Sequence, residues 1–248
     1  MKINFFTALF ILLIINSHVS CTSHKKDKKN YNAKNATETN SWKSLLKNAE
    51  DTIHWKSTKS DNFPQEGWEF KNNELTLFSG RKGGDLITKK KYNNFELKME
   101  FKYSSHANSG VKYFVNNLKN IKKDKNDLVG FEYQIIDDFN QEEIPGFTDQ
   151  TGSTGAIYLL YAPDSAKHLN PAKEWNSLQI RVKENNVIHW LNEKEIINVD
   201  ISSDDFINQI QDTKFKNYKE FGKMSEGYIL LQNHGDQVQF RNIMIKEI

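Results

Sequence analysis

Glu132 and Gln134 are polar residues inside an otherwise apolar segment, where their side chains can be held in place for chemistry. They alternate with aromatic and aliphatic residues in the segment 131–136, so both project from one face of a predicted β-strand. A glutamate in such a position can act as a base or as a metal ligand. The same alternation also suits an ordinary solvated sheet face, and spacing alone does not separate the two interpretations.

A second segment, near the C-terminus, repeats this arrangement. Gln232 and His234 follow the apolar run that begins at Tyr228. They are two residues apart, so their side chains would project from the same face of a strand, and Arg241 follows in the next strand-like segment. Histidine can carry a proton near neutral pH, and arginine can hold a developing oxyanion. With a carboxylate, these residue types are the ones needed for proton transfer at a sugar.

The elements that must position these residues are predicted to be strands. In the segment 95–103 every odd residue is apolar or aromatic and every even residue is charged, which is typical of an antiparallel strand with one buried face. We expect a tight turn at Asn185-Asn186, a short helix near 204–210 and an exposed polar loop at 116–127. Further strands are predicted at 111–115, 131–136, 156–161, 178–183, 187–191, 228–232 and 238–245.

Many short strands without alternating helices predict an all-β fold, a sandwich or jelly roll of two antiparallel sheets in a single domain. The chain has one cysteine among 248 residues. It therefore has no intramolecular disulfide and no cysteine-based zinc site, so burial of apolar surface must stabilise the fold.

The charge of the chain is unevenly distributed. Residues 22–41 carry five lysines against Asp27 and Glu38, whereas residues 42–248 carry 28 basic and 30 acidic residues. The basic excess therefore lies in an N-terminal tail, and the mildly acidic remainder argues against a nucleic-acid partner.

The N-terminus predicts export. Lys2 and the apolar run 5–15 are typical of a signal peptide over residues 1–20, and Cys21 stands directly after small residues, where a lipoprotein signal places the acylated thiol. His18 departs from the leucine that is usual there. We expect residues 21–41 to be a disordered Lys/Asn-rich tether and residues 42–248 to be the folded domain, placed outside the cytoplasm and bound to the membrane only through its lipid. Plain secretion with a free Cys21 is the alternative.

Other candidate motifs are weaker. The glycine-rich segment 80–84 precedes a strand rather than a helix and is interpreted as a turn. Asp137, next to Asp138 at a strand end, is a candidate ligand for a divalent cation, although no local motif establishes one. Isolated histidines and tryptophans are expected to be surface or packing residues more often than ligands or sugar platforms; they are His54, His106, His168, His189, Trp68, Trp175 and Trp190.

A series of short motifs runs from Trp42 to Ile248. It comprises Trp68-Glu69-Phe70, Gly84-Asp85-Leu86-Ile87-Thr88, Asn94 to Phe101, Asn108-Ser109-Gly110-Val111, Phe131 to Asp137, Thr154 to Tyr158, Glu174-Trp175-Asn176, Trp190-Leu191-Asn192, Lys214-Phe215, Phe221-Gly222, Leu231 to Asp236 and Phe240 to Ile243. In order and spacing these motifs resemble the 3-keto-disaccharide hydrolase domain family. Asn72-Asn73 departs from the family's usual Asp-Gly turn, and Asn48-Ala49-Glu50 departs from a glycine-containing turn.

The resemblance implies a concanavalin A-like sandwich, often on a lipoprotein, that acts on glycosides oxidised at carbon 3. A ketone at carbon 3 acidifies the hydrogen on carbon 2, so a base can remove it, expel the leaving group at carbon 1 and leave a product that water hydrates. In this hypothesis Glu132 is the base or a metal ligand and His234 is the acid/base partner. The substrate-positioning residues would be Asn108, Gln134, Tyr158 and Arg241.

Two alternatives stay open from the sequence. A carbohydrate-binding sandwich without catalysis would use the same fold, since fold does not determine function. A structural surface lipoprotein would be supported if Glu132, His234 and Arg241 lay on separate faces. A divalent cation would stabilise an enolate, and the sequence does not say whether one is bound.

Overall fold

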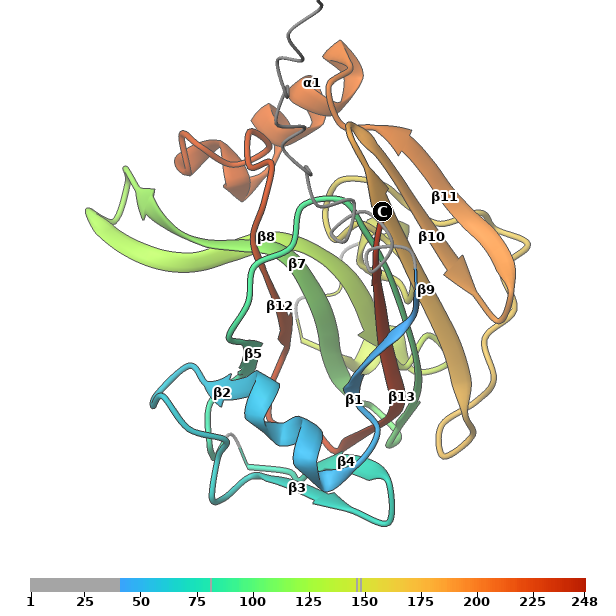
Figure 1. Cartoon of the computed structure of the whole chain (residues 1–248). Coiled ribbons are helices and arrows are strands. Elements are labelled where there is room, and N and C mark those ends of the chain that lie inside the picture. Colours follow the sequence, from blue (N-terminus) through green and yellow to red (C-terminus); the bar gives the residue numbers. More distant parts are fainter. Residues whose placement is uncertain (1–40, 81, 146, 148) are drawn as a thin grey trace, which may run out of the picture. The chain divides into compact units, whose positions relative to one another are not determined.

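The fold consists of two antiparallel β-sheets that enclose one apolar core (Figure 1). The computed structural model describes residues 41–248 except 81, 146 and 148. One sheet has eight strands, in the order β11-β10-β9-β6-β13-β4-β3 with β1 paired to β13, and the other has five, in the order β2-β5-β12-β7-β8. The predicted all-β jelly-roll sandwich is confirmed. The predicted signal peptide, Cys21 and the tether to residue 40 lie outside the described residues.

The strands of the eight-stranded sheet come from the beginning, the middle and the end of the domain. They are β1 (Lys43–Leu46), β3 (Trp68–Lys71), β4 (Glu74–Leu77), β6 (Phe95–Tyr103), β9 (Asn176–Lys183), β10 (Asn186–Leu191), β11 (Lys194–Asp200) and β13 (Val238–Glu247). The strands of the five-stranded sheet are β2 (Trp55–Ser57), β5 (Leu86–Thr88), β7 (Asn108–Asn120), β8 (Lys125–Ile136) and β12 (Tyr228–Leu231).

The helices are short. They are α1 (Asp204–Asp212) and the 3-10 helices η1 (Ala49–His54), η2 (Gln141–Glu143), η3 (Gln150–Gly152) and η4 (Lys214–Asn217). Ser203 caps α1 by accepting a hydrogen bond from the backbone of Phe206, whose ring packs edge-on against Phe131 of β8 with centroids 5.4 Å apart. None of the described helices has the length and apolar character needed to cross a membrane.

The core follows the alternation seen in the sequence. In β6 the odd residues 95–103 are buried against the second sheet, while the even, charged residues face outward. Tyr113 and Tyr133 of the five-stranded sheet reach across the core to β10, where the Tyr113 hydroxyl lies 2.9 Å from His189 Nε2 and the Tyr133 hydroxyl donates to the Trp190 carbonyl. His189 is fully buried, as expected for a packed histidine, and burial lowers its pKa to about 4.

Three local predictions were wrong. Residues 116–127 are not a loop, because β7 and β8 continue as a long paired hairpin through this polar stretch (Figure 1). Residues 156–161 do not form a strand, since the chain turns there, with Leu159 at a φ of 63°. The turn between β9 and β10 uses Glu184 and Asn185, one residue earlier than expected. By contrast, Asn72 and Asn73 both adopt positive φ, as asparagine can where glycine is usual.

Candidate active site

The candidate site lies on the outer face of the five-stranded sheet, around Glu132. Because Phe131, Tyr133 and Ile135 face the core, Glu132 and Gln134 face away from it, yet they are only 7% and 2% exposed. The segment 155–158 runs along the free edge of β8 and accounts for part of this burial. The Tyr158 amide donates to the Glu132 carbonyl at 3.0 Å. Two polar side chains are therefore buried on a sheet face that is not the core.

A lysine and a glutamine hold the Glu132 carboxylate. Lys112 lies opposite Glu132 in the β7–β8 ladder, and its Nζ is 3.4 Å from Glu132 Oε2. Gln232, oriented to satisfy both neighbours, donates to Glu132 Oε1 and accepts from Lys112 Nζ, each at 3.2 Å. Burial alone would lower the pKa of Lys112, but the carboxylates of Glu132 and Asp85 outweigh burial and raise it. Lys112 therefore stays a cation beside Glu132.

Gly110 provides the space that the carboxylate occupies. A Cβ at this position would lie 2.6 Å from Glu132 Oε1 and 3.0 Å from its Cγ. Only glycine leaves that volume free, so Gly110 belongs to the site although it carries no functional group.

Tyr158 and Lys214 add a phenol and a second cation. The Lys214 Nζ lies 4.8 Å from the centroid of the Tyr158 ring. Burial, reinforced by the Glu132 carboxylate, raises the pKa of Tyr158, which keeps its hydroxyl protonated. Desolvation lowers the pKa of Lys214, Glu132 opposes this effect and Lys112 adds to it. Among the described residues, no carboxylate forms an ion pair with Lys214.

Gln134 and Asn108 extend the site along the strands toward His234. Gln134 Nε2 donates to Asn108 Oδ1 at 3.1 Å, whereas Gln134 Oε1 is buried without a hydrogen-bond partner in the described part of the chain. An unpaired buried acceptor is costly unless a ligand or water satisfies it. His234 and Asn108 line a neighbouring cavity of about 490 Å³, which His106 and Asp236 also line.

The structure thus brings most of the predicted residues together. Glu132, Gln134, Asn108 and Tyr158 form one continuous patch, and His234 lies in the cavity next to it. No direct hydrogen bond between Glu132 and His234 is present among residues 41–248 as described. The sequence assigned no role to Lys112, Gly110 or Lys214, although Gly110 and Lys214 stand within motifs of the family resemblance. The one sequence signal for Lys112 is that it is two residues from Gly110 in β7, which places both residues on the same face of the strand.

Arg241 is not part of this site. It lies on β13, in the other sheet, where its Nε donates to Glu100 Oε2 at 2.8 Å and its guanidinium stacks 4.0 Å from the centroid of Trp175. The pairing of β13 with β4 and β6 places it there. The prediction that Arg241 positions substrate beside Glu132 therefore does not agree with the structure.

Asp137 does not fit the predicted role of cation ligand. It is fully buried, and its carboxylate accepts hydrogen bonds from the His106 amide (2.9 Å), the Phe139 amide (3.2 Å) and Asn140 Nδ2 (2.8 Å). Donors therefore face both oxygens, and Asp137 organises the turn after β8. Within the described residues, no group of three His, Cys, Asp or Glu side chains is arranged to hold a metal ion.

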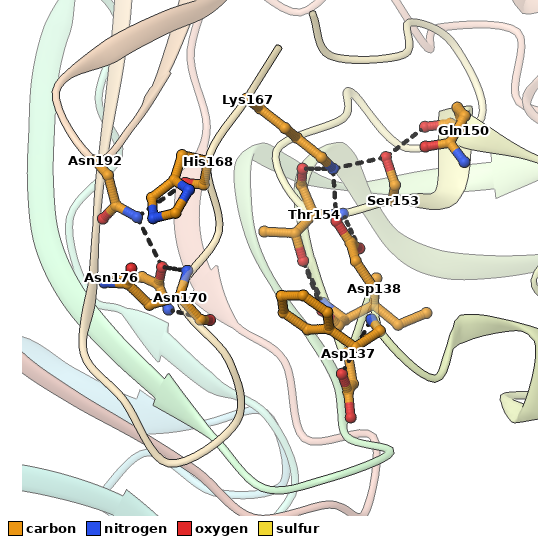
Figure 2. A network of polar contacts seen from close by, with 12 residues as sticks. Asp137, Asp138, Gln150, Ser153, Thr154, Lys167, His168, Asn170, Asn176 and Asn192 are labelled. Atoms are coloured by element: carbon orange, nitrogen blue, oxygen red, sulfur yellow. Dashed lines mark hydrogen bonds and ion pairs between the residues drawn. The ribbon is translucent and has the colours of Figure 1, made fainter. Parts of the chain in front are cut away.

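A half-buried ion pair holds the loop that leads to Tyr158, and Figure 2 shows its network of polar contacts. Lys167 Nζ contacts Asp138 Oδ2 at 2.7 Å, Ser153 Oγ at 2.9 Å and the Thr154 carbonyl at 2.6 Å. Asp138 also accepts from the Thr154 amide at 2.9 Å. Because Thr154 directly precedes the segment that pairs with β8, this network helps to hold Tyr158 beside Glu132.

Comparison with known proteins decides the family. Residues 41–246 match the model of the 3-keto-alpha-glucoside-1,2-lyase-like domain. The chain belongs to this family. A 3-keto-disaccharide hydrolase of Bacteroides thetaiotaomicron is 32% identical over 180 residues, which cover 66% of this chain and 62% of that relative. The match therefore spans less than two thirds of the relative's length.

Two solved structures are also similar. Both are crystal structures of proteins from Parabacteroides distasonis designated putative glycosyl hydrolase. The first has a TM-score of 0.70 and 27% identity, covering 84% of this chain and 94% of that one. The second has a TM-score of 0.61 and 26% identity, covering 84% of this chain and all of the other.

Proposed function

We propose that this protein cleaves glycosides whose sugar carries a ketone at carbon 3, with Glu132 as the base. The observation that carries the proposal is a buried carboxylate on the outer sheet face, held by Lys112 and Gln232. Membership of the 3-keto-glucoside lyase-like family and similarity to a 3-keto-disaccharide hydrolase support this substrate class.

The proposed reaction begins at carbon 2. Glu132 takes the proton that the ketone acidifies, and the C–H electron pair forms an enolate. Collapse of the enolate breaks the bond between carbon 1 and the leaving oxygen, which takes a proton from His234. Water then adds to the resulting double bond: its hydroxyl bonds to carbon 1 while His234 takes its proton, and Glu132 returns a proton to carbon 2. Both residues regain their starting protonation states, and the net reaction is hydrolysis.

In this proposal the remaining residues bind the sugar hydroxyls and stabilise the enolate. The protonated Tyr158 hydroxyl and the Lys214 ammonium stabilise the enolate oxygen on carbon 3. Gln134, through its unpaired carbonyl oxygen, and Asn108 accept hydrogen bonds from sugar hydroxyls. A divalent cation does not fit beside Glu132, because the Lys112 ammonium already lies 3.4 Å from its carboxylate. We therefore assign no step to a metal.

The test compares two glutamates that are both paired with a lysine. Glu132→Gln is expected to abolish turnover of a 3-keto-disaccharide and exchange of the carbon-2 hydrogen with D₂O. Glu96, 3.0 Å from Lys246 on the other sheet, provides the matched control, and Glu96→Gln should leave both activities unchanged. A wild-type protein that binds glycans without consuming any 3-keto substrate would contradict the proposal and favour a binding module. Mass spectrometry after turnover in H₂¹⁸O distinguishes a lyase from a hydrolase. The unsaturated sugar released by elimination alone contains no label, whereas the hydrated sugar contains ¹⁸O.

We further propose that the protein acts outside the cytoplasm, anchored through acylated Cys21. The sequence of residues 1–21 supports this location. Wild type is expected to partition with membranes and Cys21→Ala with the soluble fraction. Identical partitioning of both would contradict the anchor.

A further inference from the structure

We propose that the outer face of the eight-stranded sheet carries a second, non-catalytic site that binds a neutral oligosaccharide. A cavity of about 710 Å³ lies on this face, within the size range of small-molecule sites. Side chains of β10, β9, β6 and β13 line it. These four strands are neighbours in the sheet, so the groove crosses it over about 14 Å, enough for more than one sugar ring.

An aromatic wall and free hydrogen-bonding groups define the groove. Trp190 of β10 is half-buried and lines one side, and Met244 of β13 adds apolar surface. On the floor, the side chains of Ser177 and Gln179 make no hydrogen bond within the described residues, and Asn242 uses only its Nδ2, which donates to Glu100 Oε1 at 2.6 Å. An indole beside free hydroxyl and amide groups matches a ligand that presents C–H faces and hydroxyls together.

The charged groups at the groove are paired or stacked, which argues for a neutral ligand. Glu100 accepts a hydrogen bond from Arg241 Nε at 2.8 Å. Lys98 rests on the Trp42 ring, 4.3 Å from its centroid, and the Arg181 guanidinium lies 5.9 Å from the centroid of the Trp190 ring. Lys47 and Glu193, both exposed, lie at the rim with opposite charges. Among the described residues, each charge at the groove therefore has an opposite charge or an aromatic ring beside it, which favours a polyhydroxylated ligand.

The groove is separate from the candidate active site. Glu132 faces outward from the five-stranded sheet and Trp190 faces outward from the eight-stranded sheet, with the core between them. A ligand in the groove cannot touch Glu132. The proposed function supplies only the expectation that carbohydrate is present, so this site can exist even if the proposed reaction is wrong.

The experiment measures glycan binding and turnover of a 3-keto-disaccharide in the same variants of the full chain. Binding is followed by calorimetry with malto-, cello-, xylo- and laminari-hexaose and by affinity electrophoresis with the parent polysaccharides. Trp190→Ala is expected to weaken binding of at least one of these glycans about tenfold or more while turnover of a 3-keto-disaccharide is unchanged. Gln179→Ala gives a second, structurally mild variant, because its side chain makes no hydrogen bond in the described part of the chain, and it should weaken the same glycan.

Trp175→Ala is the matched control. Trp175 lies on the same face, outside the groove, and its ring is covered by Lys102 at 4.5 Å and Arg241 at 4.0 Å. Its loss should leave glycan binding unchanged. The proposal is overturned if wild type binds none of the four glycans, if neither Trp190→Ala nor Gln179→Ala weakens binding, or if a dimer forms that Trp190→Ala dissociates. Glu132→Gln should retain full binding, so failure of the proposed reaction and failure of this site are distinguishable.

Discussion

Gly110→Ala is a direct test of whether Glu132 must be held in one position. The new methyl group would lie 2.6 Å from Glu132 Oε1, well inside an ordinary contact of about 3.4 Å or more, so the carboxylate must retreat by about 0.8 Å. Gly110 does not have a positive φ, so alanine introduces no backbone strain. The substitution moves the base without removing it.

The expected effect is a loss of catalysis with little loss of stability. A misplacement of about 1 Å at a reacting group costs up to about 100-fold in rate, so kcat for a 3-keto-disaccharide should fall by about 10- to 100-fold. The contacts of Glu132 with Lys112 and Gln232 lengthen, which destabilises the fold, while replacement of a strand glycine by alanine stabilises it by about 0.5–1 kcal/mol. The melting temperature should therefore move by only a few degrees.

The assay is steady-state turnover, with the melting temperature measured on the same samples. Gly152→Ala is the control, because a Cβ there meets only Phe147 at an ordinary 3.5 Å, and its turnover should equal that of wild type. A Gly110→Ala protein that is fully folded and turns over at the wild-type rate would refute the assignment of Glu132 as a positioned base.

Three further predictions concern charge and stability. Lys112→Met leaves a buried carboxylate without its cation and should lower the free energy of unfolding by about 3 kcal/mol, measured by urea denaturation. Lys167→Met should cost less, about 2 kcal/mol, because the half-buried Asp138 loses its partner (Figure 2), whereas Lys90→Met, at an exposed ion pair with Glu247, should have no measurable effect. His189 has a pKa of about 4 when folded and 6.5 when unfolded, so between these pH values the unfolded chain binds the proton first and stability falls as pH falls. The loss should reach about 3 kcal/mol at pH 4 relative to pH 7, and a His189→Asn variant should lose this part of the pH dependence; an unchanged slope would contradict the buried neutral imidazole.

The local alternation of the sequence predicted most of the fold, because each strand of a two-sheet sandwich buries one face. It also identified Glu132 and Gln134, whose polarity inside an apolar run required an explanation. The hairpin at 116–127 escaped prediction because the backbone hydrogen bonds of β7 and β8 continue through a mostly polar stretch, in which Leu118 is the one buried apolar side chain. Polarity indicates exposure of side chains and says little about pairing of the backbone.

The composition of the site depended on pairings between distant segments, which alternation does not encode. Arg241 and Gln232 are nine residues apart, yet β12 and β13 belong to different sheets, so only Gln232 reaches Glu132. Lys112 is opposite Glu132 only because the β7–β8 register pairs these two residues. Strand order and register therefore decide which polar residues converge.

A glutamate paired with a lysine is not in itself a sign of function in this protein. Glu96 and Lys246 form such a pair, closer than Glu132 and Lys112, on the outer face of the eight-stranded sheet. Around Glu132, however, a glycine leaves room for the carboxylate, Gln232 contacts both partners, and Tyr158 and Lys214 add a phenol and a second cation. A fold gains little stability by burying that many polar groups on an outer face, because each must be desolvated. The cost is understandable if these groups stabilise a charge that develops only during the reaction, which is the role that we propose for them.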